Sequence, residues 1–221
     1  MIMSSAIIWT IQLLILPAIS PLFVGIIRKI KAKFQNRQGA SITQPYKDIW
    51  KLFNKDEVIS SDASWIFRFA PFIIFAVTLA VGAGIPIFAS FLSNPFASDI
   101  LAMIYLLAIG TFFLALAGMD TGSAFGGFAS SREMTIAALA EGGLLFSLLT
   151  VGIISGTTNL FSISNTISSF DFHFSLPIIL AFIGFFVAML AETARFPFDN
   201  PATHLELTMI HEAMILEYSG K

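Results

Sequence analysis

Residues 100–119, ILAMIYLLAIGTFFLALAGM, hold no charged side chain. The hydrocarbon core of a bilayer is about 30 Å thick, and an α-helix of roughly 20 apolar residues crosses it. Four other windows have similar length and composition, so the predicted membrane spans are residues 6–27, 69–92, 100–119, 134–155 and 172–191. Lipid offers no partner to unpaired backbone groups, and the windows lack the alternation of strands, so each span is predicted to be helical.

The composition of the whole chain agrees with a membrane environment. Apolar residues make up 56% of the 221 residues and charged residues only 12%, against about 25% charged residues in an average soluble domain. There is no Cys, so disulfides and any iron–sulfur cluster held by this chain alone are excluded. We therefore predict a single all-α integral membrane domain over residues 1–221, a polytopic transmembrane bundle of about five helices. No metal site and no nucleic-acid partner are expected.

The basic residues lie on one side of these spans. All twelve Lys and Arg fall in residues 28–68, 120–133 and 192–221, and the connections 93–99 and 156–171 contain none. By the positive-inside rule the three basic segments are cytoplasmic, with the N-terminus outside and the C-terminal tail inside. The charges follow the first apolar run, which favours a retained first helix over a cleaved signal peptide. The expected location is the inner (cytoplasmic) membrane.

Residues 46–53, within the first cytoplasmic segment, predict a short amphipathic helix. The apolar side chains share one helical face: Tyr46, Ile49, Trp50 and Phe53. The charged side chains lie off that face: Lys47, Asp48 and Lys51. Trp and Tyr beside Lys are typical of a helix that lies in the membrane interface.

Glu141 interrupts the fourth predicted span. An ionised carboxylate inside a bilayer costs several kcal/mol, so Glu141 is expected to face water or a partner. Gly142 and Gly143 follow it and predict the close approach of another helix. We interpret Glu141 as part of a proton relay. The alternative is a carboxylate that is hydrogen-bonded inside the bundle for packing alone.

The segment after the last span is unusually rich in ionisable groups. Eight of them occur among apolar side chains: Glu192, Arg195, Asp199, His204, Glu206, His211, Glu212 and Glu217. Asn200 as a cap and Pro201 in the first turn predict a helix, with His204 and His211 near one of its faces. The segment is suited to proton exchange or to docking a partner, and ordinary cytoplasmic charge is the alternative.

Residues 119–133, MDTGSAFGGFASSRE, are rich in Gly. They do not follow a strand and lack the phosphate-loop Lys, so nucleotide binding is not indicated. We predict a tight, ordered cytoplasmic loop at 120–133, with Arg132 and Glu133 at the start of the fourth helix.

The segment at residues 192–220 resembles the family that contains the quinone-site membrane subunit of respiratory complex I. RFPFD at 195–199 and EYSG at 217–220 fit that whole family. NPATHLELTMIHE at 200–212 resembles the branch of formate hydrogenlyase and hydrogenase-4, the membrane-bound group 4 [NiFe]-hydrogenases. The likeness covers nearly the whole chain, because other segments fit the same branch: QPYKDIWKLFNK at 44–55, DTGSAFGG at 120–127 and SREM at 131–134.

The resemblance implies a membrane-anchor and ion-coupling subunit of a multisubunit redox complex. Such a subunit links a soluble arm to proton or sodium translocation and holds no redox centre itself. The implied partners are soluble hydrogenase-like large and small subunits and antiporter-like membrane subunits, besides the lipid bilayer. Iron–sulfur clusters and a nickel–iron centre are expected in those partners, and no cofactor in this chain. Family members continue with further helices after the EYSG motif, so the chain is expected to be C-terminally truncated.

The resemblance also implies roles for individual residues. Proton or ion coupling is implied for seven of them: Glu141, Glu192, Arg195, Asp199, Glu206, Glu212 and Glu217. Docking of the soluble arm is implied for five: Arg132, Glu133, His204, His211 and Tyr218. The family usually has Pro after the mid-membrane Glu, whereas this chain has Gly142. No residue is expected to be catalytic, to bind a cofactor or to ligate a metal.

Three other functions stay open at this point. A quinone-binding subunit of NADH:quinone oxidoreductase (complex I) is one, and the pattern His204…His211-Glu212 argues against it. A stand-alone ion transporter would normally show inverted repeats and broken helices, and neither is evident. A purely structural anchor is the third.

Because the sequence has no Cys, its topology can be tested with single cysteines at Ser93, Ser164, Ser41 and Ser123. An impermeant thiol reagent applied to intact cells is expected to label positions 93 and 164 only, because they lie in the connections without basic residues. Labelling at position 41 or 123 would contradict the predicted orientation.

Overall fold

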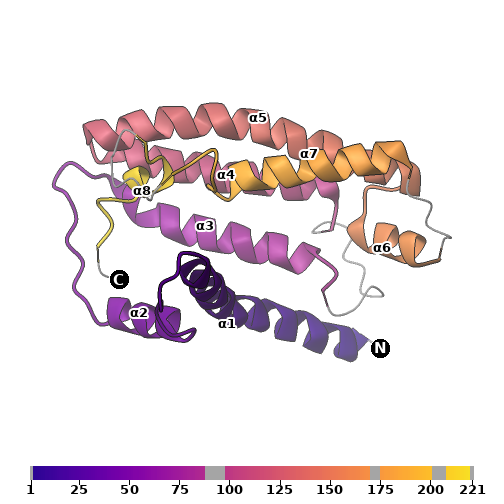
Figure 1. Cartoon of the computed structure of the whole chain (residues 1–221), viewed down its shortest axis with the longest axis horizontal. Coiled ribbons are helices and arrows are strands. Elements are labelled where there is room, and N and C mark those ends of the chain that lie inside the picture. The colour runs from indigo at the N-terminus through magenta and orange to yellow at the C-terminus, as the bar shows by residue number, and fades with distance from the viewer. Residues whose placement is uncertain (1, 88–97, 170–174, 201–207, 220–221) are drawn as a thin grey trace. The chain divides into compact units, whose positions relative to one another are not determined.

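We analysed a computed structural model, which describes residues 2–87, 98–169, 175–200 and 208–219 (Figure 1). Over these residues the regular elements are all helices, and the one β feature is an isolated bridge between Asp99 and Asn159. The all-α prediction is therefore confirmed. The predicted single domain is divided into two compact units, which are described separately below. Unit 1 comprises Met1–Ile59 with Tyr218–Lys221, and unit 2 comprises Ser60–Glu217.

Unit 1 contains α1 (Ile2–Phe34) and α2 (Gln44–Phe53). Helix α1 continues beyond the predicted end of the first span at residue 27. Its last turn carries Lys31 and Lys33. Their positive charges interact favourably with the negative, C-terminal end of the helix dipole. Helix α2 confirms the amphipathic helix that the sequence predicts.

Three contacts hold α2 against α1. The Tyr46 hydroxyl donates a 2.5 Å hydrogen bond to the Ala18 carbonyl oxygen. The loop before α2 passes so close to Gly25 that a Cβ there would overlap the Ile42 carbonyl oxygen. The third contact is an ion pair between Arg28 and Asp48, with Nη1 and Oδ2 3.9 Å apart. The position of α2 on α1 is thus fixed by both polar contacts and a glycine.

Unit 2 is a bundle of roughly parallel and antiparallel apolar helices. It contains α3 (Trp65–Gly84), α4 (Ile100–Asp120), α5 (Ala124–Ser155) and α7 (Leu176–Glu192). Helix α3 packs against α4, α4 against α5, and α5 against α7 (Figure 1). Within the described residues, four helices are long and apolar enough to cross a membrane, namely α1, α3, α4 and α5. The chain is therefore a multi-pass membrane protein.

The fifth predicted span corresponds to α7, which is shorter than the other four. Its 17 residues give a helix of about 26 Å at about 1.5 Å per residue, slightly less than the hydrocarbon thickness. Residues 172–174, the start of the predicted span, lie outside the described residues.

The prediction of a loop at 120–133 is wrong over most of that range, because α5 begins at Ala124. Ser123 is extended at the N-cap position, with φ −71° and ψ 131°. Two successive glycines then stand inside a helix. Gly126 is needed there because a Cβ would overlap the Gly118 carbonyl oxygen of α4. Gly126 therefore serves close helix packing rather than a loop.

Helices α5 and α7 run antiparallel, and small residues set their register. A Cβ on Gly143 would lie 3.4 Å from the Ala188 Cβ, and a Cβ on Gly184 would lie 3.0 Å from the Ser147 Oγ. By this register, the C-terminal end of α7 lies beside the N-terminal half of α5. Gly142 does not take part, since a Cβ there would meet no described atom within 4 Å.

The connection predicted at 156–171 contains an additional short helix, α6 (Leu160–Ser169). The Asn159 Oδ1 caps it by accepting hydrogen bonds from the amides of Phe161 (3.0 Å) and Ser162 (3.3 Å). Asp99 caps α4 nearby and also accepts a 2.6 Å hydrogen bond from the Thr158 hydroxyl. That hydrogen bond lowers the pKa of the Asp99 carboxyl below its ordinary value.

Adjacent glycines give a matched test of the contact between α4 and α5. Gly126→Ala is expected to lower the melting temperature in detergent, since overpacking typically costs roughly 1–3 kcal/mol. Gly127→Ala is the control, because a Cβ there meets no described atom within 4 Å. It is expected to be neutral or to stabilise by up to about 1 kcal/mol through helix propensity. Equal destabilisation by both substitutions would contradict the close approach at Gly126.

Candidate functional site

Helix α7 ends in a tight reversal of the chain. The Arg195 amide donates to the Leu190 carbonyl oxygen (2.9 Å) and the Ala194 amide to that of Ala191 (3.0 Å). Ala194 has a positive φ of 49°. This pairing, with a left-handed residue after the helix end, is the Schellman motif. It turns the chain directly after Glu192 and keeps the following segment next to the end of α7.

Asp199 lies in that segment and is 3% exposed. Its Oδ1 accepts a 3.0 Å hydrogen bond from the Ile210 amide, and its Oδ2 a 3.1 Å hydrogen bond from the His211 amide. These amides open α8 (His211–Met214), and the first amides of a helix have no partner within it. Asp199 therefore caps a helix eleven and twelve residues further along the chain.

The predicted helix from Pro201 through His211 is not continuous. Residues 201–207, which include His204 and Glu206, lie outside the described residues. Residues 208–210 are not helical, and α8 begins only at His211. The Asp199 cap gives the physical reason, because it satisfies amides that a longer helix would have paired internally.

Helix α8 is short, and packing against α4 and α5 holds it in place. It contributes to a buried apolar cluster made of Ala115, Ala129, Met209, Ala213 and Met214. Gly118 of α4 makes room for this cluster, since a Cβ there would lie 3.2 Å from the Met214 Cβ. The C-terminal segment is thus anchored at the end of the bundle where α4 ends and α5 begins.

Four carboxylates and one imidazole come together at this end of unit 2. Glu192, at the end of α7, interacts electrostatically with Glu141 and Glu133 of α5. Glu133 interacts in the same way with Asp199, and Asp199 with His211. We call Glu141, Glu192, Glu133, Asp199 and His211 the acidic row. It runs from the interior of α5 to the start of α8.

Glu192 and His211 are two partly buried members of the acidic row. One oxygen of Glu192, Oε1, is buried without a hydrogen-bond partner among the described residues. Burial lowers the pKa of the His211 imidazole, opposed by the negative charges of Asp199 and Glu212 and assisted by Arg195. A neutral imidazole can accept a proton at its unprotonated ring nitrogen and donate one from its N–H group.

The structure brings together most, but not all, of the residues predicted to be functional. Arg195 and Glu212 lie close enough to His211 to influence its charge. Arg132 lies elsewhere on α5, with its guanidinium 5.5 Å from the Phe128 ring centroid. Glu217 is exposed at the end of unit 2, and Tyr218 belongs to unit 1. Glu133, predicted for docking, lies in the acidic row.

Asp120 is a structural residue whose role the sequence analysis missed. Its carboxylate accepts hydrogen bonds from the Ser64 amide and hydroxyl, both 2.7 Å, and from the Phe67 amide at 3.2 Å. It therefore caps α3 from the end of α4. The available signal was Ser64 directly before an apolar run, which is typical of an N-cap.

These features define a class: a polytopic membrane protein whose helix bundle carries a row of acidic side chains toward a packed C-terminal segment. Residues 6–221 match the family described as NADH dehydrogenase, and the chain belongs to that family. The resemblance on which the sequence analysis relied is thereby confirmed.

Two curated relatives specify the branch. Hydrogenase-4 component C of Escherichia coli (strain K12) is 38% identical over 95% of this chain and 65% of its own length. Formate hydrogenlyase subunit 4 of the same organism is 34% identical over 95% of this chain and 67% of its own length. The chain thus spans about two thirds of the length of each of these two relatives.

A solved structure supports the fold. It is that of the membrane-bound sulfane sulfur reductase, an archaeal respiratory membrane complex. The match has a TM-score of 0.75 and 22% identity, and covers 96% of this chain and 75% of the other. At this level of identity the likeness shows the fold alone.

The Asp199 cap can be tested by amide hydrogen exchange. Asp199→Ala is expected to accelerate exchange at Ile210 and His211, because loss of a cap costs typically about 1 kcal/mol. Glu212→Ala, which removes an exposed acid of α8, is the control and should leave these two amides protected. Unchanged protection in the Asp199 variant would show that apolar packing alone holds α8.

Proposed function

We propose that this chain is the membrane-anchor and ion-coupling subunit of a multisubunit redox complex of the hydrogenase-4 and formate hydrogenlyase type. The acidic row is the observation that carries the proposal. A subunit that only anchors a soluble arm needs apolar spans, but no line of carboxylates leading inward from the docking end. The names of the two curated relatives support the type of complex.

The electrostatics of the acidic row explain how coupling would work. The repulsion between two like charges varies inversely with their separation and is roughly 4 kcal/mol at about 4 Å for an effective dielectric constant of about 20. Electrostatic interactions join Glu141 to Glu192, Glu192 to Glu133, and Glu133 to Asp199, and each of these pairs consists of two acids. Adding or removing a proton at one end therefore changes the energy of the ionised form of the next member. A charge change at α8 would in this way reach Glu141 inside α5.

The proposed orientation places the end of unit 2 that carries α8 in the cytoplasm. Ser64 at the start of α3 is bonded to Asp120 at the end of α4, so these helix ends lie together. The register of α5 and α7 adds the N-terminal half of α5 and the end of α7 to the same side of unit 2. The basic residues of unit 2, Arg68, Arg132 and Arg195, belong to these four ends, as the positive-inside rule expects of a cytoplasmic face.

The partners in this proposal are a soluble arm with hydrogenase-like large and small subunits, and antiporter-like membrane subunits. The arm would dock on the cytoplasmic segment that contains Arg195 and α8. Its iron–sulfur and nickel–iron centres would lie in the partner chains, in keeping with a chain that has no Cys. The translocated ion is a proton or a sodium ion.

The test is Glu141→Gln in the assembled membrane complex. The amide keeps the shape and hydrogen-bonding capacity of Glu141 but removes its charge and its titratable proton. We expect electron transfer from the soluble arm to an artificial dye to remain and ion translocation by reconstituted vesicles to fall at least about ten-fold, equivalent to about 1.4 kcal/mol.

Glu57→Gln is the matched control, since it removes an exposed carboxylate of unit 1 outside the acidic row. It should leave both activities at the level of the unsubstituted complex. Equal translocation by the Glu141 variant and the control would favour the purely structural anchor. Retention of the soluble arm on the membranes is measured in parallel, so that a loss of assembly is distinguished from a loss of coupling.

A further inference from the structure

Residues 28–55 in unit 1 are strongly basic. They hold eight basic side chains and one acidic side chain, Asp48. The basic residues are Arg28, Lys29, Lys31, Lys33, Arg37, Lys47, Lys51 and Lys55. By contrast, residues 60–217 hold three basic and eleven acidic side chains. The net charge of −2 for the chain therefore conceals a concentrated positive surface on the end of α1 and on α2.

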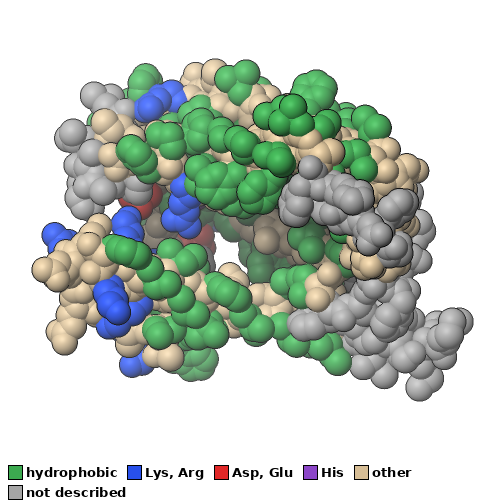
Figure 2. Space-filling model, turned by 45° about the vertical axis from the view of Figure 1, so that its right-hand side comes forward, with side chains coloured by type: hydrophobic (Ala, Val, Ile, Leu, Met, Phe, Trp, Pro, Cys, Tyr) green, Lys and Arg blue, Asp and Glu red, His purple; other side chains and the backbone are tan. Residues whose placement is uncertain are grey.

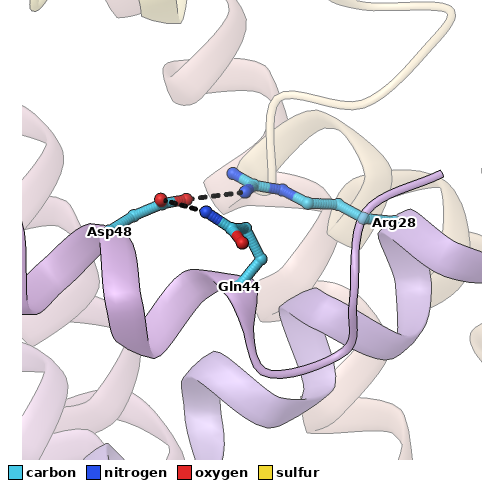
Figure 3. A network of polar contacts seen from close by, with 3 residues as sticks. All are labelled: Arg28, Gln44 and Asp48. Atoms are coloured by element: carbon cyan, nitrogen blue, oxygen red, sulfur yellow. Dashed lines mark hydrogen bonds and ion pairs between the residues drawn. The ribbon is translucent and has the colours of Figure 1, made fainter.

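The one acid of this surface is already engaged. Asp48 accepts a 2.8 Å hydrogen bond from the Gln44 Nε2 and faces the Arg28 guanidinium at 3.9 Å. Figure 3 shows both side chains directed at the two carboxylate oxygens. Asp48 is consequently paired with Arg28 rather than with Lys47 or Lys51 of its own helix. The ammonium groups of Lys47 and Lys51 can therefore bind an external partner.

The side of α2 that faces away from Lys47, Asp48 and Lys51 is apolar and exposed. Trp50 is 74% exposed and Phe53 is 66% exposed. The hydrogen bond from Tyr46 to Ala18 and the burial of Pro45 fix the rotation of α2 against α1. At the lower left of Figure 2, Lys and Arg atoms lie directly beside hydrophobic ones. The helix thus presents an apolar face bordered by ammonium groups, and it cannot turn that face inward without breaking these contacts.

We propose that the end of α1 and α2, residues 28–55, bind the headgroups of anionic phospholipids. Trp50 and Phe53 enter the boundary of the acyl chains, and Lys47, Lys51 and Lys55 bind phosphate groups above it. This assignment is independent of the redox function proposed above.

Charge complementarity and side-chain type both favour lipid as the occupant. An indole ring next to ammonium groups suits the headgroup level of a bilayer, where one end of the side chain is apolar and the other is wet. Lys gives non-directional attraction to phosphate, which suits mobile headgroups. Each basic residue near an anionic surface contributes about five-fold in binding.

The chain has three Trp residues, so Trp50 can be made the single reporter by Trp9→Phe with Trp65→Phe. The full chain is reconstituted in vesicles of phosphatidylcholine with a minority of phosphatidylglycerol, with bromine on the acyl chains of one lipid or the other. We expect quenching of Trp50 by both lipids. After correction for their molar fractions, quenching by phosphatidylglycerol should be at least about two-fold stronger, and high salt should weaken this preference.

The variant Lys47→Gln/Lys51→Gln/Lys55→Gln is expected to keep the quenching but to lose the preference, so that the corrected ratio falls to about one. A reporter that retains Trp65 instead of Trp50, in unit 2, should keep its own ratio when the three lysines are replaced. Absence of quenching at Trp50 by either lipid would overturn the proposal, because it would show that α2 does not enter the boundary of the acyl chains. Equal quenching by the two lipids in the unsubstituted chain would overturn the headgroup preference.

Discussion

An unpaired backbone amide near lipid costs several kcal/mol, and this constraint governs how the helices of the chain begin. Three aspartates satisfy it. Asp99 caps α4, Asp120 at the end of α4 caps α3, and Asp199 caps α8. The last two join elements that are distant in sequence, so the caps also fix which helix ends lie together. The candidate site depends on the last of these caps, because Asp199 is itself a member of the acidic row and holds the start of α8, where the row ends.

Small residues then set how closely the helices approach. Between membrane-spanning helices there is no hydrophobic driving force to exclude water, so van der Waals contact between backbones carries much of the association. Gly126 of α5 meets the backbone of α4 at Gly118, and Gly143 meets α7 at Ala188. The second contact brings the end of α7 beside the middle of α5, between Glu133 and Glu141. The proximity of the acids is therefore a consequence of glycine positions as much as of the acids themselves.

Much of this fold could be predicted from the sequence, because hydropathy over long windows is dictated by the solvent. The long apolar helices and the amphipathic helix α2 follow from composition and spacing. The start of α5 could not be predicted, since two successive glycines lower helix propensity and the contact with Gly118, which explains Gly126, is not visible in the sequence. The prediction of one helix running from Pro201 through His211 was wrong for a related reason. Its cap, Asp199, acts across more than ten residues, and no local pattern reveals that.

The sequence likewise predicts only in part which of the functional residues lie together in the structure. Glu133 follows Arg132 directly, which suggests one shared role, yet neighbours on a helix point about 100° apart. Glu133 faces Glu192 and Asp199, while Arg132 lies over Phe128. This separation matters for coupling. A carboxylate paired with an arginine keeps its charge over a wide range of pH and transmits little, whereas carboxylates that adjoin one another respond to each other's ionisation. The electrostatic interactions of Glu192 with Glu141 and Glu133, and of Glu133 with Asp199, join one acid to the next, so the ionisation of each acid changes that of its neighbour.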